Sequence, residues 1–253
     1  MPKPAEHIMI SVQGLTKQIG SQQILRGINL EVATGETLVI IGRSGGGKSV
    51  LLKHLIGLMT PTSGEVWIEG KQIVGLGERE LLPIRKRVGM MFQSGALFDS
   101  MTVEENVAFP LRESGIRDPK VIAQKVAEAL EVVELTGHEK KMPVNISGGM
   151  KKRVALARVI VNQPACILYD EPTAGLDPIV SDSIDHLIRR LQKRFGVTSI
   201  VVTHDMKSAA YIADKIAYIH EGLIYFYGCP DELFASKDPM IRDFVNGHSG
   251  ETD

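Results

Sequence analysis

The fold of this 253-residue chain is decided by the stretch Gly42-Arg43-Ser44-Gly45-Gly46-Gly47-Lys48-Ser49. A strand-like apolar run, residues 37–41, precedes it, and a helical pattern, residues 48–58, follows it. Glycines let the backbone wrap closely around a phosphate with its N–H groups pointing inward, and the helix N-terminus adds its dipole. The stretch therefore predicts a nucleotide-binding loop, in which Lys48 reaches the β- and γ-phosphates and Ser49 binds Mg²⁺.

Apolar, β-rich runs recur along the chain, with helical patterns between several of them. The expected strands are residues 8–12, 28–32, 37–41, 66–68, 88–92, 167–170, 199–203, 217–219 and 223–227. The expected helices include residues 119–135, residues 179–194, and one whose apolar face carries Met150, Val154, Ala157 and Val161. Alternating strands and helices favour a mainly parallel sheet with helices on its faces. The turn His220-Glu221-Gly222 indicates that the last two strands are antiparallel.

The middle of the chain has few strand signals and several helical ones. We therefore expect one domain over residues 8–247, with an α/β core of about residues 8–93 and 164–247. Residues 94–163 are expected to form an inserted helical subdomain, and the polar residues 248–253 a flexible tail.

Composition limits the classes of partner. The net charge is −1, so the basic footprint of a nucleic-acid-binding protein is missing. The two cysteines, Cys166 and Cys229, are far apart and fit no metal spacing, which indicates a reducing compartment. Residues 1–9 have no apolar signal core, and no apolar run is long enough to cross a bilayer. We expect any work on a membrane to be done through a partner chain.

Two acids close the apolar run 166–169. Paired carboxylates at the end of a buried strand are costly unless they hold something positive. Asp170 is predicted to orient Mg²⁺, and Glu171 to face the γ-phosphate and polarise the attacking water. Alone, an Asp-Glu pair after a strand is usually a helix cap or a solvated turn. Beside a phosphate-binding loop it favours catalysis.

Two further polar residues follow expected strands. His204 comes after residues 199–203, and Gln93 comes after strand 88–92. Ligands of open α/β sheets bind at the carboxyl ends of the strands, so both are candidates for the same site. A neutral glutamine there could bridge Mg²⁺ and the lytic water. The candidate catalytic residues are thus Lys48, Gln93, Glu171 and His204, and the candidate metal ligands are Ser49, Gln93 and Asp170.

A second glycine motif, Ser147-Gly148-Gly149, opens the helix that carries Val154. It is either a capped helix with flexible glycines or a second anion site at a helix N-terminus. A chain that binds one nucleotide hardly needs two such sites for itself. The interpretation as an anion site is consistent with these residues binding the nucleotide of a neighbouring copy.

The order of these motifs resembles the ATP-binding cassette family over nearly the whole chain. Gly42–Ser49 is similar to the Walker A loop, residues 167–170 to the Walker B strand, and Glu171 to the catalytic base. Gln93 matches the Q-loop glutamine and His204 the switch histidine. The resemblance implies an α/β fold with a P-loop RecA-like core, an antiparallel β-subdomain and an inserted helical signature subdomain. It also implies an ATPase that converts ATP and water to ADP and phosphate.

Residues 146–150, Ile-Ser-Gly-Gly-Met, resemble the Leu-Ser-Gly-Gly-Gln signature, and residues 174–177 match the D-loop. The resemblance implies that two copies close head to tail around two ATP–Mg²⁺. Each nucleotide then lies between the Walker A loop of one copy and Ser147–Gly149 of the other. Two positions depart from the family pattern. Met150 replaces a glutamine, and Ile19 stands where many cassettes stack an aromatic ring on adenine, which predicts weak discrimination between bases.

The segment after Gln93 carries a narrower resemblance. Residues 92–98 and 101–112, together with Met150, look like the ATPase of Mla-type lipid transporters. This implies integral permease subunits, an MCE-domain protein, a small cytoplasmic accessory subunit and phospholipid as cargo. The chain would then lie on the cytoplasmic face of a bacterial inner membrane. The alternatives are the ATPase of a small-solute importer, a soluble ABC ATPase of DNA repair or translation, and a P-loop kinase or regulatory switch.

Overall fold

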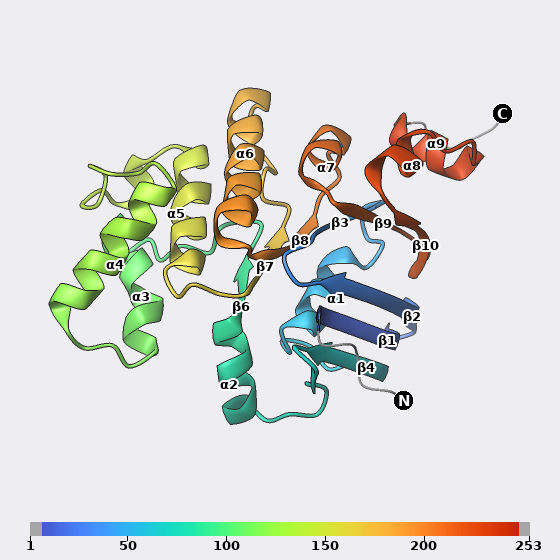
Figure 1. Ribbon diagram of the computed structural model, residues 1–253, viewed down its shortest axis with the longest axis horizontal. Coiled ribbons are helices and arrows are strands. Elements are labelled where there is room, and N and C mark those ends of the chain that lie inside the picture. The colour runs from blue at the N-terminus through green and yellow to red at the C-terminus, as the bar shows by residue number, and fades with distance from the viewer. Residues whose placement is uncertain (1–6, 248–253) are drawn as a thin grey trace.

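The molecule contains two β-sheets: the larger runs through its middle, and the smaller lies at one side (Figure 1). The computed structural model describes residues 7–247. Residues 248–253, the tail expected to be flexible, and residues 1–6 lie outside this range. The larger sheet has six strands in the order β10-β9-β3-β8-β7-β6. They are β3 (Thr37–Gly42), β6 (Val88–Met91), β7 (Cys166–Asp170), β8 (Thr198–Val202), β9 (Lys215–His220) and β10 (Leu223–Gly228).

Five strands of the larger sheet run parallel, and β10 is an antiparallel edge strand. The predicted turn before β10 is confirmed, because β9 and β10 pair across Glu221 and Gly222. These two residues have φ of 47° and 77°, as a tight two-residue hairpin loop requires. The parallel order brings the carboxyl ends of β3, β6, β7 and β8 to one edge of the sheet.

The smaller sheet is antiparallel, with the order β2-β1-β4-β5. Its strands are β1 (Ile8–Ile19), β2 (Gln22–Ala33), β4 (Ser63–Ile68) and β5 (Lys71–Gln72). β1 and β2 extend well beyond the expected runs 8–12 and 28–32, because their outer parts are polar and exposed while still paired to each other. Apolar runs therefore marked only the buried part of these strands.

The five parallel strands of the larger sheet are mostly buried on both faces and mostly apolar, whereas the edge strand β10 alternates exposed and half-buried residues. Alternate residues of β3 point to opposite sides: Val39 and Ile41 join one hydrophobic cluster, and Leu38 and Ile40 join another. The first cluster includes buried residues of the helices within residues 103–212, and the second lies between the sheet, the helix at residues 48–55 and the antiparallel sheet. Figure 1 shows these layers on either side of the six-stranded sheet.

Helices follow most of the parallel strands. Those around the larger sheet are α1 (Lys48–Leu55), α2 (Glu78–Arg87), α6 (Pro178–Phe195), α7 (Met206–Ile212), α8 (Pro230–Phe234) and α9 (Pro239–Val245). The expected helix 48–58 ends three residues early, before Gly57, whose φ of 66° stops the helix. The expected helix 179–194 is α6, with Asp177 as its N-cap and Gly196 as its C-cap.

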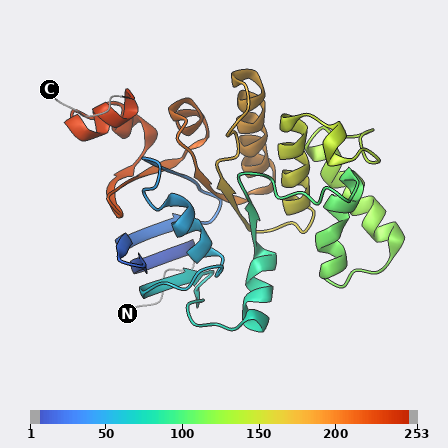
Figure 2. The same ribbon diagram turned by 180° about the vertical axis from the view of Figure 1, so that it is seen from behind.

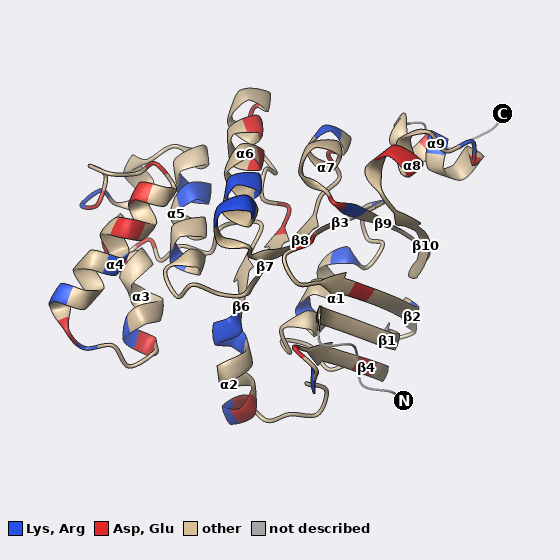
Figure 3. Ribbon diagram, in the orientation of Figure 1, with Lys and Arg blue, Asp and Glu red and all other residues tan. Residues whose placement is uncertain are grey.

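A group of helices lies between β6 and β7 in the chain. It contains α3 (Val103–Glu113), α4 (Pro119–Val132), the 3₁₀ turn η1 (Pro143–Asn145) and α5 (Gly148–Ile160), with no strand among them. Figure 2 shows from behind that this group lies at the end of the larger sheet away from the antiparallel sheet. Lys/Arg and Asp/Glu positions are mixed over all layers of the ribbon (Figure 3). Within residues 7–247, no helix is both long and apolar enough to span a membrane.

Candidate active site

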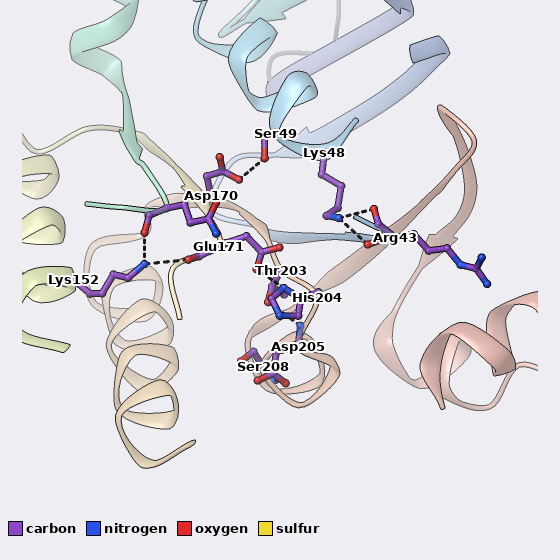
Figure 4. A network of polar contacts seen from close by, with 12 residues as sticks. Arg43, Lys48, Ser49, Lys152, Asp170, Glu171, Thr203, His204, Asp205 and Ser208 are labelled. Carbon is purple, nitrogen blue, oxygen red and sulfur yellow. Dashed lines mark hydrogen bonds and ion pairs between the residues drawn. The ribbon is translucent and has the colours of Figure 1, made fainter. Parts of the chain in front are cut away.

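The predicted site residues come from neighbouring strand ends. The loop 42–49 leaves β3, Asp170 and Glu171 end and follow β7, and His204 follows β8 by two residues. Figure 4 shows Lys48, Ser49, Asp170, Glu171 and His204 gathered in one region. The structure therefore brings these five together, as the parallel-sheet rule predicted.

Two glycines of the loop have no room for a side chain. Gly42 has φ of 155°, and a Cβ there would lie 2.5 Å from the carbonyl oxygen of Ile219. Gly47 has φ of 91°, and a Cβ there would lie 2.8 Å from Cδ2 of Leu25. Gly47 is also the N-cap of α1, and no side chain accepts from the first N–H groups of this helix. Open N–H groups at a helix N-terminus, on a backbone that any Cβ would obstruct, fit a bound phosphate.

The side chain of Lys48 lies against the first residues of the loop 42–49. It is 8% exposed, and its Nζ donates to the carbonyl oxygens of Gly42 at 2.7 Å and Arg43 at 3.0 Å. Burial lowers the pKa of Lys48, while the negative charges of Glu171 and Asp170 act in the opposite direction. The ammonium is thus held at the loop by carbonyl oxygens and by the field of two acids.

Ser49 and Asp170 meet across the sheet edge. The Ser49 hydroxyl donates to Oδ1 of Asp170 at 2.7 Å, which joins the first turn of α1 to the end of β7 (Figure 4). A hydroxyl and a carboxylate are hard oxygen donors, and Mg²⁺ binds through one or two carboxylates together with phosphate oxygens and water. This pair, next to the phosphate-binding loop, fits a Mg²⁺ ion.

Glu171 and His204 form a pair at the open side of the site. Nδ1 of His204 lies 2.9 Å from Oε2 of Glu171, and the imidazole is exposed while the carboxylate side chain is only 12% exposed. Glu171 has φ of 49°, a left-handed conformation that non-glycine residues rarely adopt. Its N–H donates to the carbonyl of Val202 at 2.9 Å, which ties this backbone to β8.

Gln93 lies two residues past the end of β6, and its side chain is exposed. Its main-chain carbonyl joins the site by accepting a short hydrogen bond from Nζ of Lys152. The same ammonium donates to the carbonyl of Glu171 at 3.3 Å. The sequence interpretation missed Lys152. The sequence could have indicated it, because Lys152 lies on the buried side of the helix that begins at Gly148, where a charged residue needs a partner.

The second glycine motif opens α5, as expected. The Ser147 hydroxyl accepts from the N–H of Met150 at 3.3 Å, and Ser147 and Gly148 are exposed. Gly149 is buried, and a Cβ there would lie 2.5 Å from Cγ1 of Val180 in the first turn of α6. Within residues 7–247, no recorded hydrogen bond joins Ser147, Gly148 or Gly149 to Lys48. Ile19, at the end of β1, is 48% exposed and offers an apolar contact without a ring face.

Comparison with known proteins identifies the family. The family model described as ABC transporter matches residues 25–174. The chain belongs to the ABC transporter family. It is an ATPase that binds ATP and energises a transporter, as the motif order implied.

The relatives of this ABC ATPase are named after different transported substrates. A probable ribonucleotide transport ATP-binding protein of Mycobacterium leprae is 41% identical over 95% of this chain and 69% of its own length. The intermembrane phospholipid transport system ATP-binding protein MlaF of Haemophilus influenzae is 42% identical over 95% of this chain and 91% of its own length. The methionine import ATP-binding protein MetN of Mesorhizobium japonicum is also 42% identical, over 96% of this chain and 66% of its own length.

A solved cassette has the same fold. It is a dimeric ATP-binding cassette in a post-hydrolysis state with ADP and Pi, and it is 33% identical to this ABC ATPase. The match covers 88% of this chain and 99% of the other, with a TM-score of 0.81. The predicted fold class is therefore confirmed.

Proposed function

We propose that this ABC ATPase drives the movement of phospholipid between the inner and outer membranes, and so maintains lipid asymmetry. The observation that carries the proposal is the similarity to MlaF, which covers 95% of this chain and 91% of that protein. The segment after Gln93, residues 94–112, and the Met150 form of the signature support the same subfamily.

For hydrolysis, each residue of the site takes a role that its position allows. The loop 42–49 binds the phosphates, and Lys48 neutralises the β- and γ-phosphate oxygens. Ser49 and Asp170, with Gln93, would hold Mg²⁺, which would supply positive charge to the phosphate oxygens. Glu171 orients and polarises the attacking water, and His204, bonded to Glu171, contacts the γ-phosphate. Catalysis of this kind is mostly positioning and charge stabilisation.

A second copy of the chain completes the site. Ser147 and Gly148 are exposed at the N-terminus of α5, where N–H groups and the helix dipole favour a phosphate. In a head-to-tail pair, Ser147, Gly148 and Gly149 of one copy contact the γ-phosphate held by the loop of the other. ATP closes the pair, and hydrolysis reopens it. Residues 8–247 act as one domain, in which residues 94–163 are the helical subdomain.

The segment after Gln93 is a fitting platform for a permease. Phe98 is 40% exposed and packs against Phe109 with ring centroids 4.8 Å apart. The buried side chain of Asn106 holds the Phe98 main chain from both sides: it accepts from the N–H at 2.8 Å and donates to the carbonyl at 3.1 Å. An exposed aromatic ring on a rigid backbone is typical of an anchor at a protein interface.

The partners proposed are integral membrane permease subunits, an MCE-domain protein and a small cytoplasmic accessory subunit, with no nucleic acid. The ATPase then lies on the cytoplasmic face of a bacterial inner membrane, held there by the permease. A small-solute importer remains the second candidate, because MetN is as similar in identity as MlaF.

Purification from native membranes tests the cargo. The tagged full-length chain is isolated in mild detergent, co-purifying proteins are identified by mass spectrometry, and lipids are extracted from the complex. The Lys48→Ala variant is the matched control, because Lys48 is placed in ATP binding and not at the permease platform. It should assemble with the same subunits and leave cells with a weakened outer-membrane barrier, measured as sensitivity to detergent.

We expect a permease, an MCE-domain protein and bound phospholipid with both chains. Recovery of a conventional solute permease with an amino-acid-binding protein would overturn the lipid proposal in favour of the importer. A normal outer-membrane barrier in cells with Lys48→Ala as their only copy would contradict it as well.

A further inference from the structure

A buried lysine lies behind the proposed catalytic residues. Lys152 belongs to α5, one turn after the signature residues, and it is only 7% exposed. A buried ammonium is costly unless acceptors surround it. The acceptors recorded for Nζ are two main-chain carbonyl oxygens, those of Gln93 and Glu171 (Figure 4 labels Lys152 and Glu171). Burial lowers the pKa of Lys152, and the negative charges of Glu171 and Asp170 act in the opposite direction.

The two carbonyls lie just past the ends of neighbouring parallel strands, β6 and β7. β6 and β7 pair up to Met91 and Tyr169, and Gln93 and Glu171 each follow two residues later. At this point the sheet ladder has ended, and both carbonyls find partners outside the sheet. The Glu171 carbonyl accepts from the N–H of Ala174 at 3.2 Å as well as from Lys152, and the Gln93 carbonyl accepts from Lys152. The one ammonium on α5 donates to both carbonyls and so joins the two strand ends to each other.

Glu171 gains most from this link. Its left-handed backbone is strained and persists only where the surroundings hold it. Its N–H donates to Val202 of β8, and its carbonyl accepts from both Lys152 and the N–H of Ala174. With both sides of this residue fixed, the carboxylate has a defined direction, toward His204 and the phosphate-binding loop.

We propose that Lys152 is a positioning residue for ATP hydrolysis, which holds the main chain of Glu171 and Gln93 and joins both to the signature helix. Ser147 is the N-cap of α5, and we propose above that it contacts the partner's nucleotide. Lys152 therefore connects the helix of Ser147 with Glu171, the residue proposed to orient water. The inference rests on the roles proposed above for Glu171 and Gln93.

Substitution of Lys152 in the full-length chain tests the proposal. Lys152→Met keeps the length of the side chain and removes the donor and the charge, whereas Lys152→Gln removes the charge and keeps an N–H donor. Lys151→Met is the matched control on the same helix, because the Lys151 ammonium has no hydrogen bond or ion pair among those recorded for residues 7–247. For each variant we measure kcat and KM for ATP, binding of ATP to the single copy, and thermal unfolding.

In Lys152→Met we expect kcat to fall at least about tenfold, equal to 1.4 kcal/mol, while KM and ATP binding change less than about threefold. Lys152→Gln should recover most of the lost kcat, and Lys151→Met should resemble the unmodified chain. A purely structural lysine would lower stability and ATP binding together. If Lys152→Met does not fold, Lys152→Ala, which leaves room for water at both carbonyls, gives the same readout.

A normal kcat in Lys152→Met or Lys152→Ala would overturn the proposal. Equal losses in the Met and Gln variants would also overturn it, since the charge and not the hydrogen bonds would then matter. Glu171→Gln is assayed in parallel. If that variant turns over normally, the proposed function of Glu171 is wrong. If it is inactive while Lys152→Met is normal, only the role of Lys152 is wrong.

Discussion

Replacement of Gly149 by alanine tests how closely the signature helix packs on its neighbour. A Cβ at this position would lie 2.5 Å from Cγ1 of Val180, whereas carbon atoms in contact lie about 3.5–4.0 Å apart. Val180 is β-branched and stiff in its helix, so the clash of about 1 Å cannot be relieved by a simple side-chain rotation. The N-terminus of α5 must therefore move away from α6.

Two effects on stability oppose each other in this variant. Alanine is favoured over glycine in a helix interior by at most about 1 kcal/mol, and by less in the first turn. Overpacking of a buried contact costs about 1–3 kcal/mol, so the clash should dominate. We expect Gly149→Ala to lower the free energy of unfolding by about 1–2 kcal/mol, and to lower ATPase activity because Ser147 moves with the helix.

A double-mutant cycle with Val180→Ala isolates this contact. Unfolding in urea is measured for the unmodified chain, both single variants and the double variant. Once the methyl groups of Val180 are removed, Gly149→Ala should cost less than about 0.5 kcal/mol. The reasoning is refuted if Gly149→Ala is as stable as the unmodified chain, or if its cost is the same with and without Val180.

Three further predictions follow from other sites. Burial raises the pKa of Asp185 to about 6, so the folded carboxyl stays protonated where the unfolded one has ionised near 3.8, and stability falls as the pH rises through this window. Asp185→Asn keeps an acceptor for the Ser208 hydroxyl. In urea unfolding, the difference in free energy of unfolding between this variant and the unmodified chain should shift in favour of the variant by about 2 kcal/mol between pH 4.5 and pH 7. A difference that does not change with pH would show that the pKa of Asp185 is not raised. Ser147→Arg should abolish hydrolysis in an ATPase assay and leave equilibrium binding of ATP to the single copy intact, because the cation blocks only the contact with the partner's nucleotide; parallel loss of binding would assign this site to its own chain. ATP and GTP should bind within about tenfold of each other in competition experiments, since Ile19 offers no ring face for stacking, and a much stronger preference for ATP would show that another residue contacts the base.

The parts of the site that the sequence predicted are those with local signals. The loop 42–49 is marked by its own glycines, and Asp170, Glu171 and His204 follow runs so apolar that they had to be buried parallel strands. The parallel arrangement then places these residues at one sheet edge without further information. The hairpin at Glu221 and Gly222 was equally local.

Other features depend on contacts that are distant in sequence. The link from Lys152 to Gln93 and Glu171 joins residues 59 and 19 positions apart, and no periodicity marks it. Helix α2 was missed because Pro83 lies within it and a proline reads as a helix breaker, yet Leu81 and Ile84 are buried in the second cluster. The outer part of β1 is polar and is held as a strand by pairing with β2 and β4.

The central claim is that two copies of the chain close around ATP and that Glu171 orients the attacking water. Glu171→Gln keeps the size of the side chain and removes its ability to act as a base. In ATP, this variant should elute as a dimer with one ATP bound per copy, and its turnover should fall at least about a hundredfold. Light scattering coupled to size exclusion, with an ATPase assay on the same sample, measures both. Turnover close to that of the unmodified chain, or a variant that binds ATP and stays a single copy, would contradict the account.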